Sequence, residues 1–254
     1  MPKIVSIHSF RGGTGKSNIT ANVAAAIAQT GRRVGIVDTD IQSPGIHALF
    51  GFDESRIQHS LNDYLWGRCG IKETAYDVTS ILKTNPLSKA KIFLIPSSLK
   101  VGEIARVLRE GYSVDLLNQG FKELVESLKL DYLMIDTHPG INEETLLSIA
   151  ISDQLLIILR PDRQDFQGTA VAVDIARKLH VPQLFLVVNR ALVAYDFEAL
   201  RDRIQATYNA DVIGIIPNSD DVMQLASSDI FCLRFPNHPF SQEIMKISKH
   251  LISH

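Results

Sequence analysis

Short apolar runs alternate along this chain with longer segments whose apolar residues recur every three or four positions. A short apolar run is typical of a buried strand, and the longer spacing is typical of a helix with one packed face. Strands are expected at residues 4–7, 34–40, 92–96, 132–136, 153–159, 184–190 and 211–217, and residues 75–79 could pair at a sheet edge. Helices are expected at residues 19–28, 60–67, 101–109, 114–128, 166–179 and 240–252. Because the two kinds of element alternate, we predict an α/β fold with a doubly wound, mostly parallel sheet and helices on both faces.

A glycine-rich segment separates the first expected strand from the first expected helix. Its three glycines allow the backbone to turn N–H groups inward around an anion. Lys16 adds a mobile positive charge, and the Ser17 hydroxyl can ligate Mg²⁺. Strand, glycine-rich loop, Lys-Ser and helix together are the context of a phosphate-binding loop. The nucleotide phosphates are therefore assigned to Arg11, Gly12, Gly13, Thr14, Gly15, Lys16, Ser17 and Asn18.

Carboxylates end two of the other expected strands. Asp38 and Asp40 come at the end of residues 34–40, and Asp136 ends residues 132–136, just before a Pro-Gly turn. An acid in that position is a Walker B arrangement, and a buried strand end is a costly place for a carboxylate without a cation. Since ligands bind at the carboxyl ends of strands in such sheets, we expect all three acids beside the loop.

The loop itself departs from the general phosphate-binding pattern. Phe10 stands where a glycine is usual, and the remainder matches the compact Lys-Gly-Gly-x-Gly-Lys-Thr form with Arg11 in place of its first lysine. At this point the chain resembles the ParA/MinD family of deviant Walker ATPases, which implies a single P-loop ATPase domain over residues 1–254. In that family the first lysine reaches across a dimer to the partner's nucleotide. An arginine keeps the charge but not the compact shape, so Arg11 or another basic residue would do this, with Arg160 and Arg163 as the other candidates.

The resemblance also implies roles for individual side chains. The implied catalytic residues are Lys16, Asp40, which would orient the attacking water, and Arg11. The implied magnesium residues are Ser17, Asp38 and Asp136, the two acids acting through the ion's waters. The implied adenine pocket consists of Asn189, Arg190, Pro217 and Asn218. An amide such as that of Asn189 offers a donor and an acceptor together, which suits the adenine edge. For His47 and His138 a structural or surface role is the simpler interpretation, and a switch role for His138 is the alternative.

Composition narrows the class of protein further. The 254 residues contain 26 basic and 28 acidic side chains, so bulk charge does not indicate a nucleic-acid protein. Cys69 and Cys232 are far apart and have no metal-type spacing, which is typical of reduced thiols in a cytosolic protein. The first residues lead straight into a strand, without the pattern of a signal peptide, and no run approaches the length of a membrane span.

The expected function is that of an ATP- and Mg²⁺-dependent switch. The family resemblance implies a homodimer formed on ATP binding, slow intrinsic hydrolysis stimulated by an adaptor protein, and a bacterial cytoplasmic or nucleoid-associated location. The cargo would be a plasmid, a chromosome or an organelle such as the carboxysome, positioned on nucleoid DNA, and the Phe-Arg substitution is similar to the carboxysome-distribution branch. Candidates for a DNA-facing basic patch are Arg177, Lys178, Arg201, Arg203, Lys246 and Lys249.

Two other functions on the same scaffold remain open. One is a membrane-associated, MinD-like positioning ATPase. The tail at residues 240–252 disfavours it, because Lys246 and Lys249 are its only lysines or arginines and a docked helix explains its apolar face. The other is a metabolic or cluster-carrier enzyme, and the iron–sulfur version would need paired cysteines that this chain does not have.

Overall fold

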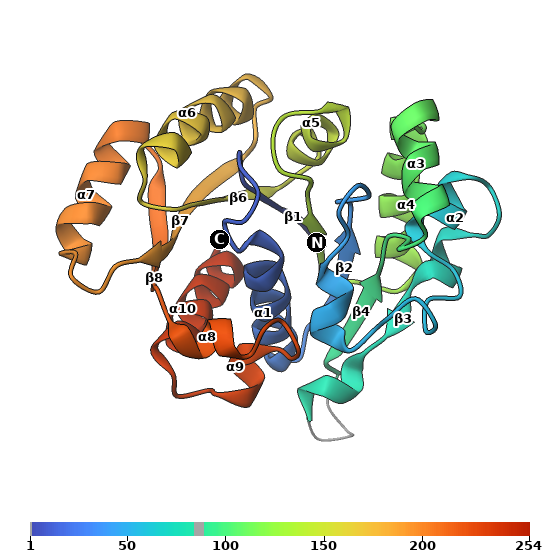
Figure 1. Cartoon of the computed structure of the whole chain (residues 1–254), viewed down its shortest axis with the longest axis horizontal. Coiled ribbons are helices and arrows are strands. Elements are labelled where there is room, and N and C mark those ends of the chain that lie inside the picture. The colour runs from blue at the N-terminus through green and yellow to red at the C-terminus, as the bar shows by residue number, and fades with distance from the viewer. Residues whose placement is uncertain (1, 84–88) are drawn as a thin grey trace.

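The structure is a computed structural model that describes residues 2–83 and 89–254; Met1 and residues 84–88 lie outside the described part. The strands are β1 (Lys3–His8), β2 (Arg33–Asp38), β3 (Tyr76–Asp77), β4 (Lys91–Ile95), β5 (Tyr132–Asp136), β6 (Gln154–Leu159), β7 (Gln183–Ala191) and β8 (Asp211–Pro217). They form one sheet in the order β3-β4-β2-β5-β1-β6-β7-β8 (Figure 1). All neighbours run parallel except β3, which pairs antiparallel with β4 at the edge.

Helices connect the strands. The α-helices are α1 (Lys16–Gln29), α2 (Leu61–Leu65), α3 (Val101–Glu110), α4 (Val114–Ser127), α5 (Glu143–Ala150), α6 (Arg163–Lys178), α7 (Phe197–Tyr208), α8 (Asp220–Gln224), α9 (Phe231–Arg234) and α10 (Pro239–Ser253). Three 3₁₀ turns, η1 (Ile46–Phe50), η2 (Ile71–Thr74) and η3 (Thr79–Leu82), lie between β2 and β4.

The core lies on both faces of the sheet. On one face α1, α9 and α10 pack against the strands. On the other face α2, α3 and α4 cover the half around β2, β4 and β5, and α5, α6 and α7 cover the half around β6, β7 and β8 (Figure 1). Strands covered on both faces are mostly apolar, and every residue of β6 is buried. The predicted doubly wound, mostly parallel sheet is therefore confirmed.

Some local predictions were wrong. The strand expected at residues 34–40 ends at Asp38, because the Asp38 side chain accepts a hydrogen bond from the Asp40 N–H and so forms a turn. Helices α5 and α7 were not predicted, although each has a local signal. Asn142 and Asp196 precede them and accept hydrogen bonds from first-turn N–H groups, as N-cap residues do.

The sheet order places the glycine-rich loop at its centre. Strand β1, which leads into the loop, is flanked by β5 on one side and β6 on the other. Successive connections run in opposite directions from this strand, so the loop stands at the switch point where doubly wound sheets bind ligands. Helix α10 packs along α1, the helix that follows the loop, and its Ile244, Ile247 and Leu251 are fully buried there.

Candidate nucleotide site

Glycine conformation shapes the loop between β1 and α1. Gly13 and Gly15 have φ angles of 75° and 91°, in a region that other residues rarely adopt. A Cβ at Gly15 would lie 2.4 Å from Nδ2 of Asn189. Gly15 is also the N-cap of α1 and offers no side-chain acceptor to the first helical N–H groups. Those N–H groups therefore remain available to an anion bound in front of the helix.

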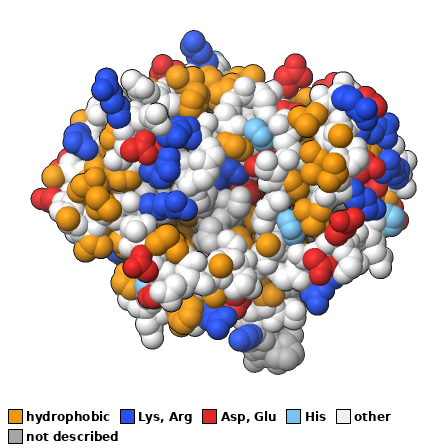
Figure 2. Space-filling model, viewed as in Figure 1, with side chains coloured by type: hydrophobic (Ala, Val, Ile, Leu, Met, Phe, Trp, Pro, Cys, Tyr) orange, Lys and Arg blue, Asp and Glu red, His pale blue; other side chains and the backbone are white. Residues whose placement is uncertain are grey.

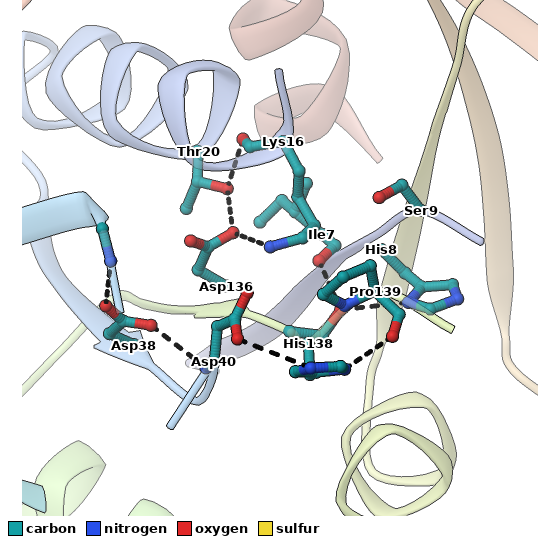
Figure 3. Close-up of polar contacts among 12 residues, drawn as sticks. Ile7, His8, Ser9, Lys16, Thr20, Asp38, Asp40, Asp136, His138 and Pro139 are labelled. Atoms are coloured by element: carbon teal, nitrogen blue, oxygen red, sulfur yellow. Dashed lines mark hydrogen bonds and ion pairs between the residues drawn. The ribbon is translucent and has the colours of Figure 1, made fainter. Parts of the chain in front are cut away.

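Lys16 and Asp136 form an ion pair beneath the loop (Figure 3). Nζ of Lys16 lies 2.8 Å from Oδ1 of Asp136, and their side chains are only 6% and 1% exposed. The Thr20 hydroxyl lies 3.2 Å from the same oxygen. The other carboxylate oxygen, Oδ2, is buried and has no hydrogen-bond partner among the described residues. Because a buried carboxylate oxygen without a donor is unfavourable, this atom is suited to accept from a water or a hydrated cation.

Asp38 stands next to Asp136 in the register of β2 and β5. Its two carboxylate oxygens accept hydrogen bonds from the N–H groups of Asp40, at 3.0 Å, and Gly45, at 3.3 Å. Burial, followed by the neighbouring Asp136 carboxylate, raises the pKa of Asp38 well above its usual range, and Lys16 opposes this effect. The site therefore brings together two carboxylates that favour an additional positive charge.

Asp40 lies in the loop after β2 and faces His138 (Figure 3). Its Oδ1 accepts a hydrogen bond from the Ser43 N–H at 3.1 Å and lies 3.7 Å from Nε2 of His138. Burial raises the pKa of Asp40, while the charge of Lys16 acts in the opposite direction. His138 in turn places Nδ1 2.6 Å from the carbonyl oxygen of Pro139.

His8, the last residue of β1, is fully buried behind this group. Its Nδ1 lies 3.0 Å from Oγ1 of Thr137, whose hydroxyl donates to the Ile7 carbonyl. The hydroxyl hydrogen is thus used, and Nδ1 of His8 carries the hydrogen of the His8–Thr137 bond. Burial first, and the charge of Lys16 second, lower the pKa of His8 to about 3. This histidine is therefore neutral and structural.

A cavity of about 360 Å³ opens above the loop. That volume is within the usual range of small-molecule sites. The expected nucleotide residues on its wall are Gly12, Gly13, Thr14, Gly15, Lys16, Ser17, Asn18, Asn189, Arg190, Pro217 and Asn218, together with Asp40. Asp38 and Asp136 are buried and do not border it. Arg11 points elsewhere, so it is the one expected phosphate residue that the structure does not bring to the cavity.

One wall of the cavity consists of residues that were not among the expected site residues. Val222 and Met223 of α8 line it, together with Phe240 from the start of α10. A signal was present, since Ser219 precedes two acids and its side chain accepts a hydrogen bond from the Val222 N–H, as in a helix N-cap. Apolar side chains in the same cavity as Asn189 suit the flat face of a nucleobase.

Arg11 is held by the N-terminal turn of α6. Its Nη1 lies 3.3 Å from Oδ1 of Asp165 and 3.8 Å from Oδ1 of Asp162. Asp165 is only 3% exposed and also pairs with Arg160 through Nε, at 3.1 Å. Two of the three candidates for a cross-dimer charge thus share one buried carboxylate. Arg163 is exposed, and its side chain makes no hydrogen bond or ion pair within the described residues.

The candidate DNA-facing residues do not share one face of the sheet. Helices α6 and α7, which carry four of them, lie opposite α10, which carries Lys246 and Lys249. Arg177 donates to the carbonyls of Tyr208 and Asn209, and Lys246 pairs with Glu243. Figure 2 shows Lys and Arg side chains over α6 and α7 and, separately, over α3. The six candidates are therefore divided between the two faces of the sheet, and those on α6 and α7 form a group separate from those on α10.

The donor set of the cavity floor fits a hydrated Mg²⁺ ion. The Ser17 hydroxyl borders the cavity, and Oδ2 of Asp136 lacks a donor beneath it. Within residues 2–83 and 89–254, no group of three or more His, Cys, Asp or Glu side chains could hold a metal ion. Phosphate oxygens, one hydroxyl and water would thus supply the ligands, which is the usual arrangement for Mg²⁺ at a nucleotide. Across the same ranges, no helix is both long and apolar enough to cross a membrane.

Comparison with known proteins gives one family and a group of relatives. The family model ParA, described as NUBPL iron-transfer P-loop NTPase, matches residues 1–252. An uncharacterized ATP-binding protein of Methanocaldococcus jannaschii is 27% identical, with 98% of this chain and 87% of that protein aligned. The flagellum site-determining protein YlxH of Helicobacter pylori is 28% identical over 99% and 82% of the two chains. An iron-sulfur cluster carrier protein of Pyrococcus horikoshii is 23% identical over 98% and 85%.

Solved structures with the same fold extend over the whole chain. The cell division ATPase MinD of Pyrococcus furiosus superposes with a TM-score of 0.83 at 19% identity, over 100% of this chain and 99% of that one. The septum site-determining protein MinD of Pyrococcus horikoshii, complexed with Mg-ADP, has a TM-score of 0.81 at 19% identity, over 99% and 96%. MinD of Aquifex aeolicus in a MinC:MinD complex has a TM-score of 0.79 at 21% identity, over 99% and 96%.

Proposed function

The chain belongs to the ParA family of P-loop NTPases, and from this premise we propose that it is an ATP-driven switch that self-associates when ATP is bound. One observation carries the proposal. The buried Lys16–Asp136 pair lies under a glycine loop whose helical N–H groups have no side-chain cap. An ammonium and free amides at the base of a cavity suit the β- and γ-phosphates of ATP. Asn189, Pro217 and Asn218 would then surround adenine.

Mg²⁺ is the cation that we propose for the bound nucleotide. Ser17 would ligate it beside the phosphate oxygens, and Asp38 and Asp136 would accept hydrogen bonds from its waters. The unpaired Oδ2 of Asp136 supports this role because it lacks a donor. When bound, the ion supplies positive charge to the phosphates. Lys16 has three donors, so it can keep its contact with Asp136 and still offer another to phosphate.

Asp40 is the residue that we propose orients the attacking water, since its carboxylate borders the cavity. Arg11 would contribute charge only after leaving Asp165 and meeting the nucleotide of a second chain. This pairing gives a physical reason for slow turnover in an isolated chain, because a stabilising arginine acts only when it is positioned at the phosphates. Arg163 is the alternative source of that charge, as it is exposed.

Positioning of an intracellular cargo is the role that we propose for the switch. The names of YlxH and of the MinD proteins, which describe site determination and cell division, support it. An adaptor protein would accelerate hydrolysis and release the dimer. DNA is proposed as the matrix, and the support for it comes only from the Lys and Arg side chains on α6 and α7. ATP-dependent binding to nonspecific DNA should then weaken steeply with salt, and binding to anionic vesicles instead would favour the membrane alternative.

An iron–sulfur carrier is the second candidate, because one group of relatives bears that name. The cysteines do not favour it. Cys69 and Cys232 pack in clusters on opposite faces of the sheet. Burial raises the pKa of Cys69 to about 11 and that of Cys232 to about 12, which leaves little of the thiolate that a cluster requires.

The deciding experiment compares the purified wild type with Lys16→Ala and Asp40→Ala, and with Asp174→Ala as an exposed control. We expect the wild type to bind Mg-ATP, dimerise with ATP and turn over well below about 10 per second. Lys16→Ala should lose ATP binding, whereas Asp40→Ala should bind ATP and accumulate the dimer. Turnover at tens per second without a partner, or hydrolysis that persists in Asp40→Ala, would contradict the proposal.

A further inference from the structure

His138 and Asp40 face each other at a distance that excludes a direct hydrogen bond. Nε2 of His138 lies 3.7 Å from Oδ1 of Asp40, whereas a bond between these atoms would need about 2.7–2.9 Å. A polar contact longer than about 3.5 Å is commonly bridged by water. Figure 3 shows the Asp40 carboxylate and the His138 ring facing each other.

The hydrogen bond of the other ring nitrogen, Nδ1, determines whether Nε2 of His138 is a donor or an acceptor. Nδ1 of His138 lies 2.6 Å from the Pro139 carbonyl oxygen. A carbonyl can only accept, so Nδ1 must carry a hydrogen and donate it. In the neutral ring Nε2 then holds a lone pair. Oδ1 of the Asp40 carboxylate is also an acceptor, so two acceptors face each other and need a shared donor between them.

We propose that His138 is a positioning residue for the attacking water, which donates one hydrogen to Nε2 of His138 and the other to Oδ1 of Asp40. This inference rests on the proposed ATPase function, and it makes His138 a second water-orienting group beside Asp40. Two fixed acceptors orient a water more tightly than one, because both hydrogens are engaged and an oxygen lone pair is left for the phosphate. His138 does not itself border the cavity, so it should affect the water rather than nucleotide affinity.

The hydrolysis step balances with this arrangement. The water oxygen bonds to the γ-phosphorus while the bond between that phosphorus and the β–γ bridging oxygen breaks. ADP leaves with the bridging oxygen and its electron pair. The product phosphate keeps one water hydrogen, and the other is released to solvent as a proton through the Asp40–His138 pair.

Two substitutions separate the effect of the Nε2 acceptor from the effect of the volume of the His138 side chain. His138→Leu removes the acceptor and keeps similar volume, whereas His138→Gln can place an amide oxygen near the position of Nε2. His180→Asn, on the exposed turn after α6, is the control. Single-turnover hydrolysis of Mg-ATP should fall about tenfold in His138→Leu and recover most of that loss in His138→Gln, with the ATP dissociation constant unchanged in both.

The outcomes of this experiment test the proposed ATPase function and the role of His138 separately. If the wild type neither binds nor hydrolyses ATP, the proposed function fails. If the wild type hydrolyses ATP and His138→Leu does so at the same rate, the role of His138 is refuted. The same holds if the hydrolysis rates of His138→Leu and His138→Gln fall equally. Neither result contradicts the proposed ATPase function. A change confined to ATP affinity would also refute the water-positioning role.

A second measurement does not require nucleotide or an altered chain. Long-range ¹H–¹⁵N correlation spectra of the wild-type protein at pH 7.5 report which ring nitrogen of His138 is protonated. We expect hydrogen on Nδ1 and a lone pair on Nε2. Hydrogen on Nε2 alone, or on both nitrogens as in a direct ion pair with Asp40, would overturn the inference.

Discussion

Replacing Gly15 with alanine perturbs the closest contact of the phosphate loop. The residue has a φ of 91°, and a Cβ there would lie 2.4 Å from Nδ2 of Asn189. That nitrogen donates a 2.7 Å hydrogen bond to the Thr14 carbonyl. The added methyl group must therefore displace the Asn189 amide and break this buried bond, in addition to straining the backbone.

The free energy of unfolding should fall by about 2 kcal/mol. A left-handed backbone costs alanine about 1–2 kcal/mol, and loss of a buried hydrogen bond adds about 1 kcal/mol. Alanine recovers about 0.5–1 kcal/mol, since it restricts the unfolded chain more than glycine does. With an m value of about 3 kcal/mol/M, the urea midpoint of the nucleotide-free protein should fall by about 0.7 M.

Two neighbouring glycines provide graded controls. Gly13 has a φ of 75°, but a methyl group added there would meet open space, so Gly13→Ala should show only the backbone cost, below about 1 kcal/mol. At Gly12 the backbone is ordinary and a Cβ would lie 3.9 Å from Cγ of Pro139, an unstrained contact. Gly12→Ala should therefore leave the urea midpoint almost unchanged.

Urea unfolding followed by circular dichroism measures the three glycine variants, Asn189→Ala, and the double variant of Gly15→Ala with Asn189→Ala. Asn189→Ala removes the atom that Gly15→Ala collides with. The double variant should thus be about 1 kcal/mol more stable than the sum of the two single effects predicts. The reasoning is refuted if Gly15→Ala is as stable as Gly12→Ala, or if the effects of Gly15→Ala and Asn189→Ala simply add.

Two further predictions concern buried charge. Asp136→Ala leaves the Lys16 ammonium without its partner, so the nucleotide-free protein should lose about 3–5 kcal/mol in urea unfolding; a loss below about 1 kcal/mol would mean that solvent replaces the pair. His8 has its pKa lowered to about 3 in the folded state, so it takes up a proton only on unfolding between about pH 6.5 and pH 3. Its contribution to stability is complete above pH 6.5 and falls by about 1.4 kcal/mol per pH unit below it. His8→Asn, which can still donate to Thr137, should therefore flatten the decline in stability between pH 7.5 and pH 5, and an unchanged pH profile would contradict this assignment.

Local pattern in the sequence determined the fold class and the loop. The apolar runs and their spacing predicted the doubly wound sheet, because strand and helix periods are properties of neighbouring residues. The glycines and Lys16 predicted the phosphate-binding loop for the same reason. Asp136 could be placed beside the loop since it ends an apolar strand, and parallel strands end at one edge.

Only the tertiary structure decided which side chains meet across the sheet. Arg11 pairs with Asp165, Asn189 bonds to the Thr14 carbonyl, and His138 faces Asp40. Each contact joins segments about 100 residues or more apart, so it depends on strand order and on the direction of each loop. The spacing of apolar residues along the chain predicts neither the strand order nor the direction of a loop, because the same local patterns are compatible with several orders of strands. The sequence thus determined that a phosphate loop exists, and the packing of distant segments decided what surrounds it.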